Sequence, residues 1–574
     1  RKNITFGNNS GYSLTTGINN IMLGTSTGMS CSGSVQNNIL MGKETGRYSS
    51  ANNLIALGTE AGKNNTSAAN NIYIGTEAGK NCNSADNILF GFNSGKNVTS
   101  GDGGNIFIGS NTGSSTSSTS NNSIAIGYNA FSNTVANQNI CLGSNSGMSM
   151  TDEDLYSEIS LDGTFNISIG VNASKNQTSG AYVISMGNEA IGVGTQGAYN
   201  IAIGTQAGYR LDGDANLAIG ADSLYYATDH VNNAGIGVDS MKNLGINSNG
   251  YTSEYGTDNM CIGTNTMRNA KRGLSNIMFG VNAGEYYDFR VSLDYETPGD
   301  VICMGSNAGR YQYAGSAISI GYEAGMGSRY GSISFTSNKI KMYRDLSNDY
   351  IHLTDTSGGT FTGVPGFTST ADGTAIAENS MYVIEGFAND SNNIGFNGVS
   401  TDRGRVVTAL TANVMTFANK QDIDLDVVTE EAGRTITIFK PSQFKNLCIG
   451  NQAGRNSYYG TGQKIGYKAG LGSATVPVNH IDYDSAVGLN NSLIGKHSGK
   501  DITDGYDNFT IGHNTLLGCH NGYRNICIGL NAGSLTTEYK NEIFTNTTHA
   551  ENLAIGHDAL FNSSNIFTDS ENLQ

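Results

Sequence analysis

The side chains best suited to acid–base chemistry are a few acidic clusters and scattered histidines. Asp152-Glu153-Asp154 and the pair Asp482/Asp484 are candidates for the two carboxylates that glycan cleavage needs about 5–10 Å apart. The eight histidines show no HxxxH or HExxH spacing. The sequence also lacks a calcium-binding nonapeptide and a GxxxxGK(S/T) nucleotide loop. We therefore interpret the acidic clusters as solvated loops and expect no catalytic residue, no cofactor, no metal site and no enzymatic activity.

Cysteine and tyrosine are the other residues whose positions are informative. Five of the eight cysteines occupy one position of a repeated motif, two residues before a glycine, where other copies have Ala, Ser, Met, Leu or Phe. This pattern is typical of a small buried hydrophobe rather than of disulfides or zinc ligands. Several tyrosines fall between copies of the motif. Exposed rings there are suited to glycan stacking or protein contacts, and they are equally suited to filling an interface between chains. The tyrosines that we predict for receptor-contact loops are Tyr225, Tyr226, Tyr286, Tyr287, Tyr311, Tyr458 and Tyr459.

These residues are positioned by a motif that recurs along most of the chain. The copy at Asn200–Gly208 reads Asn-Ile-Ala-Ile-Gly-Thr-Gln-Ala-Gly, and its first glycine, Gly204, serves as the anchor of the unit. There are 24 such anchors, and most lie 16 to 18 residues apart. The apolar–variable–apolar triplet predicts a short strand, and the Gly- and Asn-rich residues after it predict a turn. A period this short predicts one coil of a narrow β-solenoid.

Two positions of the motif predict how coils stack and associate. Asn stands four residues before the anchor in 18 of the 24 units, which predicts a stacked ladder that satisfies backbone groups. If the two flanking apolar residues point into the coil, the middle residue points out. Because that residue is also apolar, we expect it to pack on another chain, most simply in a parallel homotrimer. A dimer, or an added layer from the same chain, is the alternative. The predicted interface residues are Met22, Leu40, Tyr73, Leu89, Phe107, Cys141, Ala202, Cys261, Met278, Cys303, Cys448 and Cys527.

The period stops between residues 329 and 445. Alternating apolar runs such as Met381–Glu385 and Arg434–Phe439 predict a small β-barrel or sandwich at about 378–440. We therefore predict an all-β chain with a solenoid block at 1–328, an inserted β domain at 329–445 and a second solenoid block at 446–574. Insertions between coils, such as 151–165, are expected to project as loops that can carry binding surfaces.

Composition narrows the class of partner. A net charge of −16 opposes binding to nucleic acid or to anionic membranes. The sequence has no run of 18 apolar residues, so we expect no membrane insertion. It begins at Arg1-Lys2 without a methionine, which leads us to expect a processed or partial chain.

Two stretches resemble known families. The motif at Asn122–Ala130, Asn-Ser-Ile-Ala-Ile-Gly-Tyr-Asn-Ala, resembles the Asn-Thr-Ala-Ile-Gly-Tyr-x-Ala-Leu repeats of phage and large-virus tail fibres. It is also similar to the head repeats of bacterial trimeric autotransporter adhesins, although these have a shorter period. Segments 384–399 and 430–438 resemble a small β-barrel common in phage structural and tail proteins.

These resemblances imply a structural virion fibre or spike that forms a rigid oligomeric rod for host attachment. The implied partners are copies of the same chain, other virion structural proteins, and a glycan or protein receptor on the host surface. The implied location is the virion surface. One alternative is a trimeric adhesin on a bacterial cell surface, and another is a glycan-degrading tailspike.

Overall fold

The structure of the chain is a computed structural model. It describes residues 2–31, 34–99, 101, 103–114, 121–133, 136–149, 165–177, 180–193, 197–227, 230–244, 256–270, 273–285, 301–310, 317–326, 328–345, 350–355, 381–385, 405–410, 414–418, 429–440, 446–455, 462–471, 490–502, 505–518, 522–534 and 552–561. The chain divides into two compact units, Arg1–Lys242 and Asn243–Gln574, and each is described by itself. The regular structure of the described residues is β-strand, as predicted for an all-β chain.

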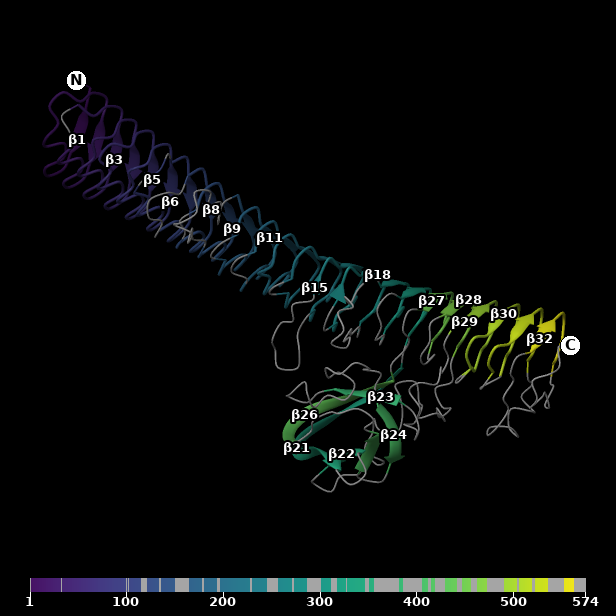
Figure 1. Cartoon of the computed structure of the whole chain (residues 1–574). Coiled ribbons are helices and arrows are strands. Elements are labelled where there is room, and N and C mark those ends of the chain that lie inside the picture. Colours follow the sequence, from purple (N-terminus) through teal and green to yellow (C-terminus); the bar gives the residue numbers. More distant parts are fainter. Residues whose placement is uncertain are drawn as a thin grey trace, which may run out of the picture. The chain divides into compact units, whose positions relative to one another are not determined.

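The first unit contains strands of three residues, one in each coil. They are β1 (Ile4–Phe6), β2 (Ile21–Leu23), β3 (Ile39–Met41), β4 (Ile55–Leu57), β5 (Ile72–Ile74), β6 (Ile88–Phe90), β7 (Ile106–Ile108), β8 (Ile124–Ile126), β9 (Ile140–Leu142), β10 (Ile167–Ile169), β11 (Ile184–Met186), β12 (Ile201–Ile203), β13 (Leu217–Ile219) and β14 (Ala234–Ile236). Each strand pairs in parallel with the next in chain order, as Figure 1 shows. This topology confirms the predicted β-solenoid of short coils.

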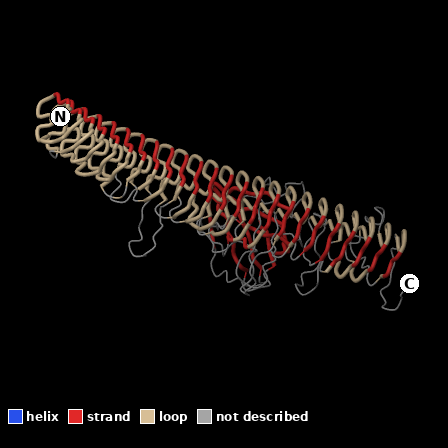
Figure 2. Tube along the Cα trace, turned by 90° about the horizontal axis from the view of Figure 1, so that it is seen from above, coloured by secondary structure: helices blue, strands red, loops and turns tan. Residues whose placement is uncertain are grey.

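Equivalent positions of the motif stack directly on one another. Tyr73 of β5 pairs with Ala56 of β4 and with Leu89 of β6, so the register between neighbouring coils does not shift. Backbone hydrogen bonds continue into the turn after the strand, where the amide of Glu77 donates to the carbonyl of Thr59 at 2.9 Å. In Figure 2 the strands lie along one side of the coils, and turns and loops form the rest. One exact register therefore aligns each side-chain position into a column.

The anchor glycine is required both by its conformation and by the closeness of the next coil. Gly75 ends β5 with a φ of 137°, a conformation that side chains rarely adopt. A Cβ atom added there would lie 2.3 Å from the carbonyl oxygen of Gly91 in the following coil. The repeated glycine thus marks a corner where neighbouring coils leave no room for a side chain.

The middle residue of each strand points into the coil. From β2 to β14 every middle residue is buried, and both flanking residues are partly or fully exposed. In β8, for example, Ala125 is 0% exposed whereas Ile126 is 41% exposed. The predicted orientation of the strand was therefore wrong. We call the middle residues, two before each anchor, the inner column, and the residues three and one before it the outer columns.

The asparagine four residues before the anchor explains this orientation. The side chain of Asn71 is buried, and its Oδ1 accepts hydrogen bonds from the backbone amide of Asn87 at 2.8 Å and from its side-chain amide at 3.1 Å. Asn87 repeats the arrangement with Asn105. This confirms the predicted asparagine ladder. Because strand side chains alternate, the residue two positions after the inward asparagine also points inward.

The second unit contains a solenoid of the same kind and a closed barrel. Its solenoid strands are β15 (Gly256–Thr257), β16 (Met260–Ile262), β17 (Gly273–Leu274), β18 (Ile277–Phe279), β19 (Ile302–Met304), β20 (Ile318–Ile320), β27 (Asn446–Ile449), β28 (Gly462–Ile465), β29 (Asn491–Ile494), β30 (Phe509–Ile511), β31 (Ile526–Ile528) and β32 (Leu553–Ile555). β20 pairs in parallel with β27, so the coil at Gly321 is followed directly by the coil at Gly450.

Antiparallel strands from the segment between β20 and β27 close into a barrel in the order β21-β22-β25-β24-β23-β26. They are β21 (Ser328–Asp345), β22 (Tyr350–Asp355), β23 (Met381–Glu385), β24 (Arg405–Leu410), β25 (Val414–Ala418) and β26 (Thr429–Lys440). The longest pairing joins β21 to β26, and these strands are labelled in Figure 1. The division of the chain at residues 328 and 445 stays a prediction.

Candidate interaction surfaces

The outer columns form an apolar face on the solenoid of the first unit. Every outer residue from β1 to β14 is Ile, Leu, Met, Phe or, once, Ala. Many of them are well exposed in the single chain: Phe90 is 50% exposed and Ile126 is 41% exposed. A typical soluble monomer has a largest apolar patch of about 300–600 Å². Two continuous columns over fourteen strands make this face a candidate interaction surface rather than a scatter of exposed side chains.

The predicted interface residues do not lie on this face. All twelve are fully or almost fully buried within their own chain, with exposed fractions of 0% or 1%. They belong to the inner column and pack against neighbouring coils, so they are unavailable to a second chain. The residues concerned are Met22, Leu40, Tyr73, Leu89, Phe107, Cys141, Ala202, Cys261, Met278, Cys303, Cys448 and Cys527. Self-association therefore stays a prediction, and the surface that suits it is the pair of outer columns.

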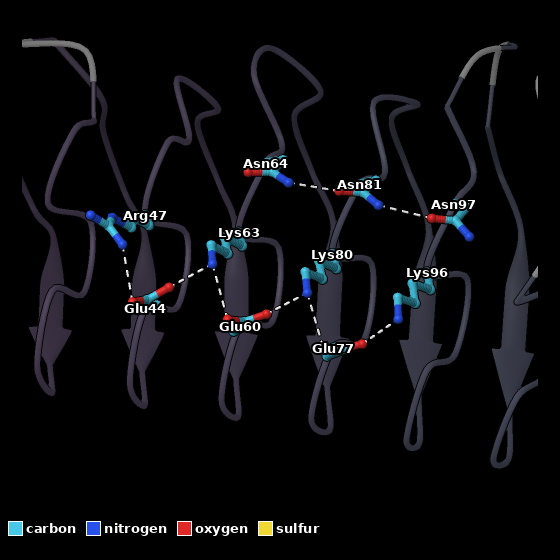
Figure 3. Close-up of polar contacts among 10 residues, drawn as sticks. All are labelled: Glu44, Arg47, Glu60, Lys63, Asn64, Glu77, Lys80, Asn81, Lys96 and Asn97. Carbon is cyan, nitrogen blue, oxygen red and sulfur yellow. Dashed lines mark hydrogen bonds and ion pairs between the residues drawn. The ribbon is translucent and has the colours of Figure 1, made fainter.

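A ladder of ion pairs runs along the turns of four neighbouring coils (Figure 3). We call it the charge ladder; it consists of Glu44, Arg47, Glu60, Lys63, Glu77, Lys80 and Lys96. Lys63 Nζ lies 2.9 Å from Glu60 Oε1 in its own coil and 2.6 Å from Glu44 Oε2 in the preceding coil. Lys80 repeats this geometry with Glu77 and Glu60. Each carboxylate of the charge ladder is thus bound by two cations.

The electrostatics of the charge ladder argue against a general-acid role for its carboxylates near neutral pH. Hydrogen bonds from Lys80 and Lys63 lower the pKa of Glu60 to about 2. The pKa values of Glu44 and Glu77 are also lowered, chiefly by hydrogen bonds from Lys63 and Lys96 respectively. A group that stays ionised cannot donate a proton at neutral pH. The charge ladder therefore holds coils in register, as does the neighbouring amide ladder, in which Asn64 donates to Asn81 at 2.7 Å and Asn81 donates to Asn97 at 2.8 Å (Figure 3).

Two of the predicted receptor-contact tyrosines, Tyr225 and Tyr226, lie together on the turns near the end of the first unit. The ring of Tyr225 stacks on that of Tyr209 at 4.8 Å and meets Tyr226 edge-on at 4.5 Å. Arg210 lies over the ring of Tyr226, and Lys242 lies 5.8 Å from the centre of Tyr225. Both tyrosines are half-buried, so this cluster has little open ring surface.

The charges around Tyr225 are balanced. Lys242 lies 2.6 Å from Asp222 and 3.1 Å from Asp239. Desolvation lowers the pKa of Lys242, but the bonds to Asp222 and Asp239 outweigh it and hold the pKa above its ordinary value. Burial, followed by the neighbouring Tyr226, raises the pKa of Tyr225. The cluster is therefore a packed aromatic and ionic site, not a reactive one.

The other predicted site residues lie outside the described residues. These are Tyr286, Tyr287, Tyr311, Tyr458 and Tyr459, together with the acidic clusters Asp152-Glu153-Asp154 and Asp482/Asp484. Their role in receptor contact, or as solvated loops, stays a prediction.

The described cysteines and histidines show no sign of reactive chemistry. The described cysteines are buried, and burial raises the thiol pKa of both Cys141 and Cys303 to about 12. A thiol with so high a pKa is a poor nucleophile and a poor metal ligand. Desolvation lowers the pKa of His497, whose Nδ1 lies 3.2 Å from Asn514 Oδ1. Over the described part of the chain, no group of three or more His, Cys, Asp or Glu side chains could hold a metal ion.

Sequence reasoning missed a stack of three aromatic rings on consecutive coils. Phe165 and Tyr182 stack at 5.0 Å between ring centres, and Tyr182 and Tyr199 at 5.1 Å, with interplanar angles of 5° and 7°. We call Phe165, Tyr182 and Tyr199 the aromatic stack. Each lies five residues before its anchor glycine, so aligning the units on their anchors would have placed the three rings in one column.

No protein-family model, curated protein or solved structure matches this chain. Within the described ranges, no helix has the length and apolarity needed to cross a membrane. The class of protein that the fold defines is thus a parallel β-solenoid with regular short coils. Its function is inferred from its surfaces.

Proposed function

We propose that this protein is a non-enzymatic structural fibre or spike protein, in which several copies pack their apolar faces against one another. The observation that carries the proposal is the pair of uninterrupted apolar outer columns in the first unit. Burying the exposed part of one such side chain contributes roughly 0.5–1 kcal/mol. Over fourteen strands these contributions add up, and they oppose the cost of ordering and desolvating the surfaces on association.

We further propose that the assembly is a homotrimer on the surface of a virus particle and serves host attachment. The support for this part is the resemblance of Asn122–Ala130 to the repeats of viral tail fibres and trimeric adhesin heads. Loops between coils, and aromatic side chains on the turns, are the surfaces suited to a receptor. Other virion structural proteins are the expected partners at the attachment end.

Native mass spectrometry of the full chain and of a double variant tests the self-association. Ile108→Glu with Ile126→Glu places two carboxylates on the apolar face, and we expect it to shift the mass from an oligomer toward a single chain. Asn111→Glu with Asn129→Glu is the matched control. It adds the same charge to the same two coils at the turn position that carries Glu44, Glu60 and Glu77 elsewhere, and we expect it to leave the oligomer intact. A monomeric wild-type protein would rule out the proposal.

Immunoelectron microscopy with an antibody raised against the chain tests the location. We expect labelling on projections from virus particles. Labelling of a bacterial envelope instead would favour the adhesin alternative. Release of oligosaccharides from host surface glycans incubated with the protein would favour the tailspike alternative and contradict a non-enzymatic role.

A further inference from the structure

The column five residues before the anchor has left-handed backbone in every coil of the first unit from the second coil on. Asn19, Asn37 and Asn53 adopt φ values of 59°, 59° and 56° there. Their side chains form a ladder, in which Asn19 donates to Asn37 and Asn37 donates to Asn53, each at 3.1 Å. Asparagine tolerates this conformation better than most residues, and its amide links coils at the same time. Asn therefore meets the needs of the fold at this position.

The aromatic stack departs from this pattern in a costly way. Phe165, Tyr182 and Tyr199 adopt φ values of 57°, 58° and 58°, and bulky residues rarely take such a conformation. Elsewhere in the first unit, burial compensates a bulky residue of this kind: Phe131 has a φ of 55° but is 0% exposed. The aromatic stack lies on the surface, where Tyr182 is still 38% exposed. Strained residues that the fold does not need are characteristic of functional sites.

The aromatic stack ends in an open ring face. Tyr199 is 60% exposed, whereas Tyr182, with a ring on either side, is 38% exposed. The difference arises because the next coil has Ala215 at the equivalent position, whose methyl group covers little of the Tyr199 ring. The backbone amide of Ala215 donates to the carbonyl of Ala198 at 2.9 Å, so the two coils are held together beneath this ring.

A carboxylate is held by the backbone amide of the residue before Tyr199. Asp214, the residue before Ala215, is exposed, and its Oδ1 accepts a hydrogen bond from the backbone amide of Ala198 at 2.7 Å. Ala198 directly precedes Tyr199, so this bond holds the carboxylate at the backbone of the residue next to Tyr199. A carboxylate has about four acceptor sites, and this bond uses one of them.

We propose that the open face of Tyr199, together with Asp214, is a binding subsite for a neutral pyranose residue of a surface glycan. A pyranose has one apolar C–H face that can lie on an aromatic ring, and hydroxyl groups that can donate to a carboxylate. The net charge of −16 disfavours polyanions, including nucleic acid, as ligands of this ring. This inference rests on the host-attachment part of the proposed function and gives that attachment a chemical class of ligand.

Binding of the full chain to a printed array of neutral and anionic oligosaccharides tests the proposal. We expect retention on neutral hexopyranose oligosaccharides. Titration calorimetry with the best-bound neutral oligosaccharide should then give an affinity at least about fivefold weaker for Tyr199→Asn and little change for Tyr199→Phe, which keeps the ring. Tyr128→Asn is the control, because Tyr128 is similarly exposed, at 57%, but does not belong to the aromatic stack.

Tyr199→Asn removes the ring without disturbing the fold, since asparagine is the residue most often found in this column. We expect Tyr199→Asn to melt at the wild-type temperature or above it. Failure of every neutral oligosaccharide to bind, or wild-type affinity in Tyr199→Asn, would overturn the subsite. Loss of oligomeric mass in Tyr199→Asn would also overturn it, because the ring would then contact a second copy of the chain. A monomeric wild-type protein that binds the oligosaccharide would contradict self-association and leave this inference standing.

Discussion

The inner and outer columns of the same strands follow opposite rules. The inner column varies from Gly235 to Tyr73 and is buried throughout the described strands of the first unit after β1. Neighbouring positions compensate for this variation. A Cβ added at Gly79 would lie 2.7 Å from the ring of Tyr73, whereas Met241 and Leu224 fill the space next to Gly235. The interior is thus packed by complementary volumes rather than by one preferred residue.

In the first unit the outer columns are uniform, although the fold of one chain buries them only in part. Strands β1 to β13 have large apolar residues at both outer positions, and β14 has one alanine. Packing within the single chain explains the inner column completely. It leaves the uniformity of the outer columns unexplained, and the proposed contact with a second copy of the chain would account for it. The residues of a three-residue strand therefore differ in role. The buried middle residue packs the interior of the coil, and the two apolar residues beside it form the apolar face.

The sharpest test of this comparison uses two adjacent residues of β8. Ala125→Glu places a charge in the coil interior and should destabilise the fold by several kcal/mol, because a buried charge without a partner is costly. Ile126→Glu places the same charge on the apolar face and should change the stability of the single chain by less than about 1 kcal/mol. Guanidinium unfolding followed by circular dichroism gives both values. Equal destabilisation of a dilute, monomeric sample would contradict the assignment of the two faces.

Truncation of aromatic side chains sharpens the same comparison. Tyr73→Ala should cost about 3–5 kcal/mol, because it leaves a cavity between coils. Phe90→Ala, on the apolar face of the next strand, should cost less in a separated chain, since Phe90 is already 50% exposed. Thermal unfolding at two protein concentrations distinguishes the effects of the two substitutions. The Phe90→Ala deficit should grow at the concentration where the wild type is oligomeric, and the Tyr73→Ala deficit should not depend on concentration.

The charge ladder should contribute a smaller, pH-dependent stability. The pKa of Glu60 is lowered from its ordinary value of 4.5 to about 2 in the folded chain. A carboxylate with a lowered pKa stabilises the fold above pH 4.5, and this stabilisation is lost as the pH falls from 4.5 toward 2. Because the side chains are partly solvated, we expect about 1 kcal/mol at neutral pH. Glu60→Gln should lower the melting temperature at pH 7, and the difference from wild type should disappear near pH 2.

A persistent difference between wild type and Glu60→Gln at low pH would mean that the variant acts through packing rather than charge. High salt supplies a second check. It should reduce the difference at pH 7, because screening weakens partly exposed ion pairs. Neither condition should change the effect of Tyr73→Ala, whose side chain lies in the interior.

The sequence allowed the fold class, the coil length and the asparagine ladder to be predicted. Gly204 and its equivalents show where each coil turns, and Asn200 and its equivalents show where side chains bond to the backbone of the next coil. These features could therefore be predicted from residue types alone. The orientation of the strand was predicted wrongly because alternation fixes only which residues share a face. The direction of the Asn200 side chain would have settled the orientation. Because Asn200 points inward, Ala202, two residues later on the same face, points inward too.

The interaction surfaces could be predicted only in part. In the charge ladder, Lys63 binds Glu44 of the preceding coil and Glu60 binds Lys80 of the following coil. Predicting these pairs requires the exact register between coils. Phe165 and Tyr199 lie 34 residues apart in the sequence and meet through Tyr182 because their three coils stack without a register shift. Tyr225 and Tyr226 lie on turns, but their packing against Arg210 and Tyr209 depends on side-chain geometry, and their predicted role in receptor contact stays a prediction.

Thiol labelling of the assembled protein tests the central claim most directly. The described cysteines are buried, so they give little background, and Cys519, which lies outside the described residues, is replaced by serine in every sample. Ile126→Cys reports on the apolar face, and Ser67→Cys, at an exposed loop position, is the control. We predict that maleimide labels Ile126→Cys at least about tenfold more slowly than Ser67→Cys, because a second copy covers the apolar face. Equal labelling rates would contradict the account.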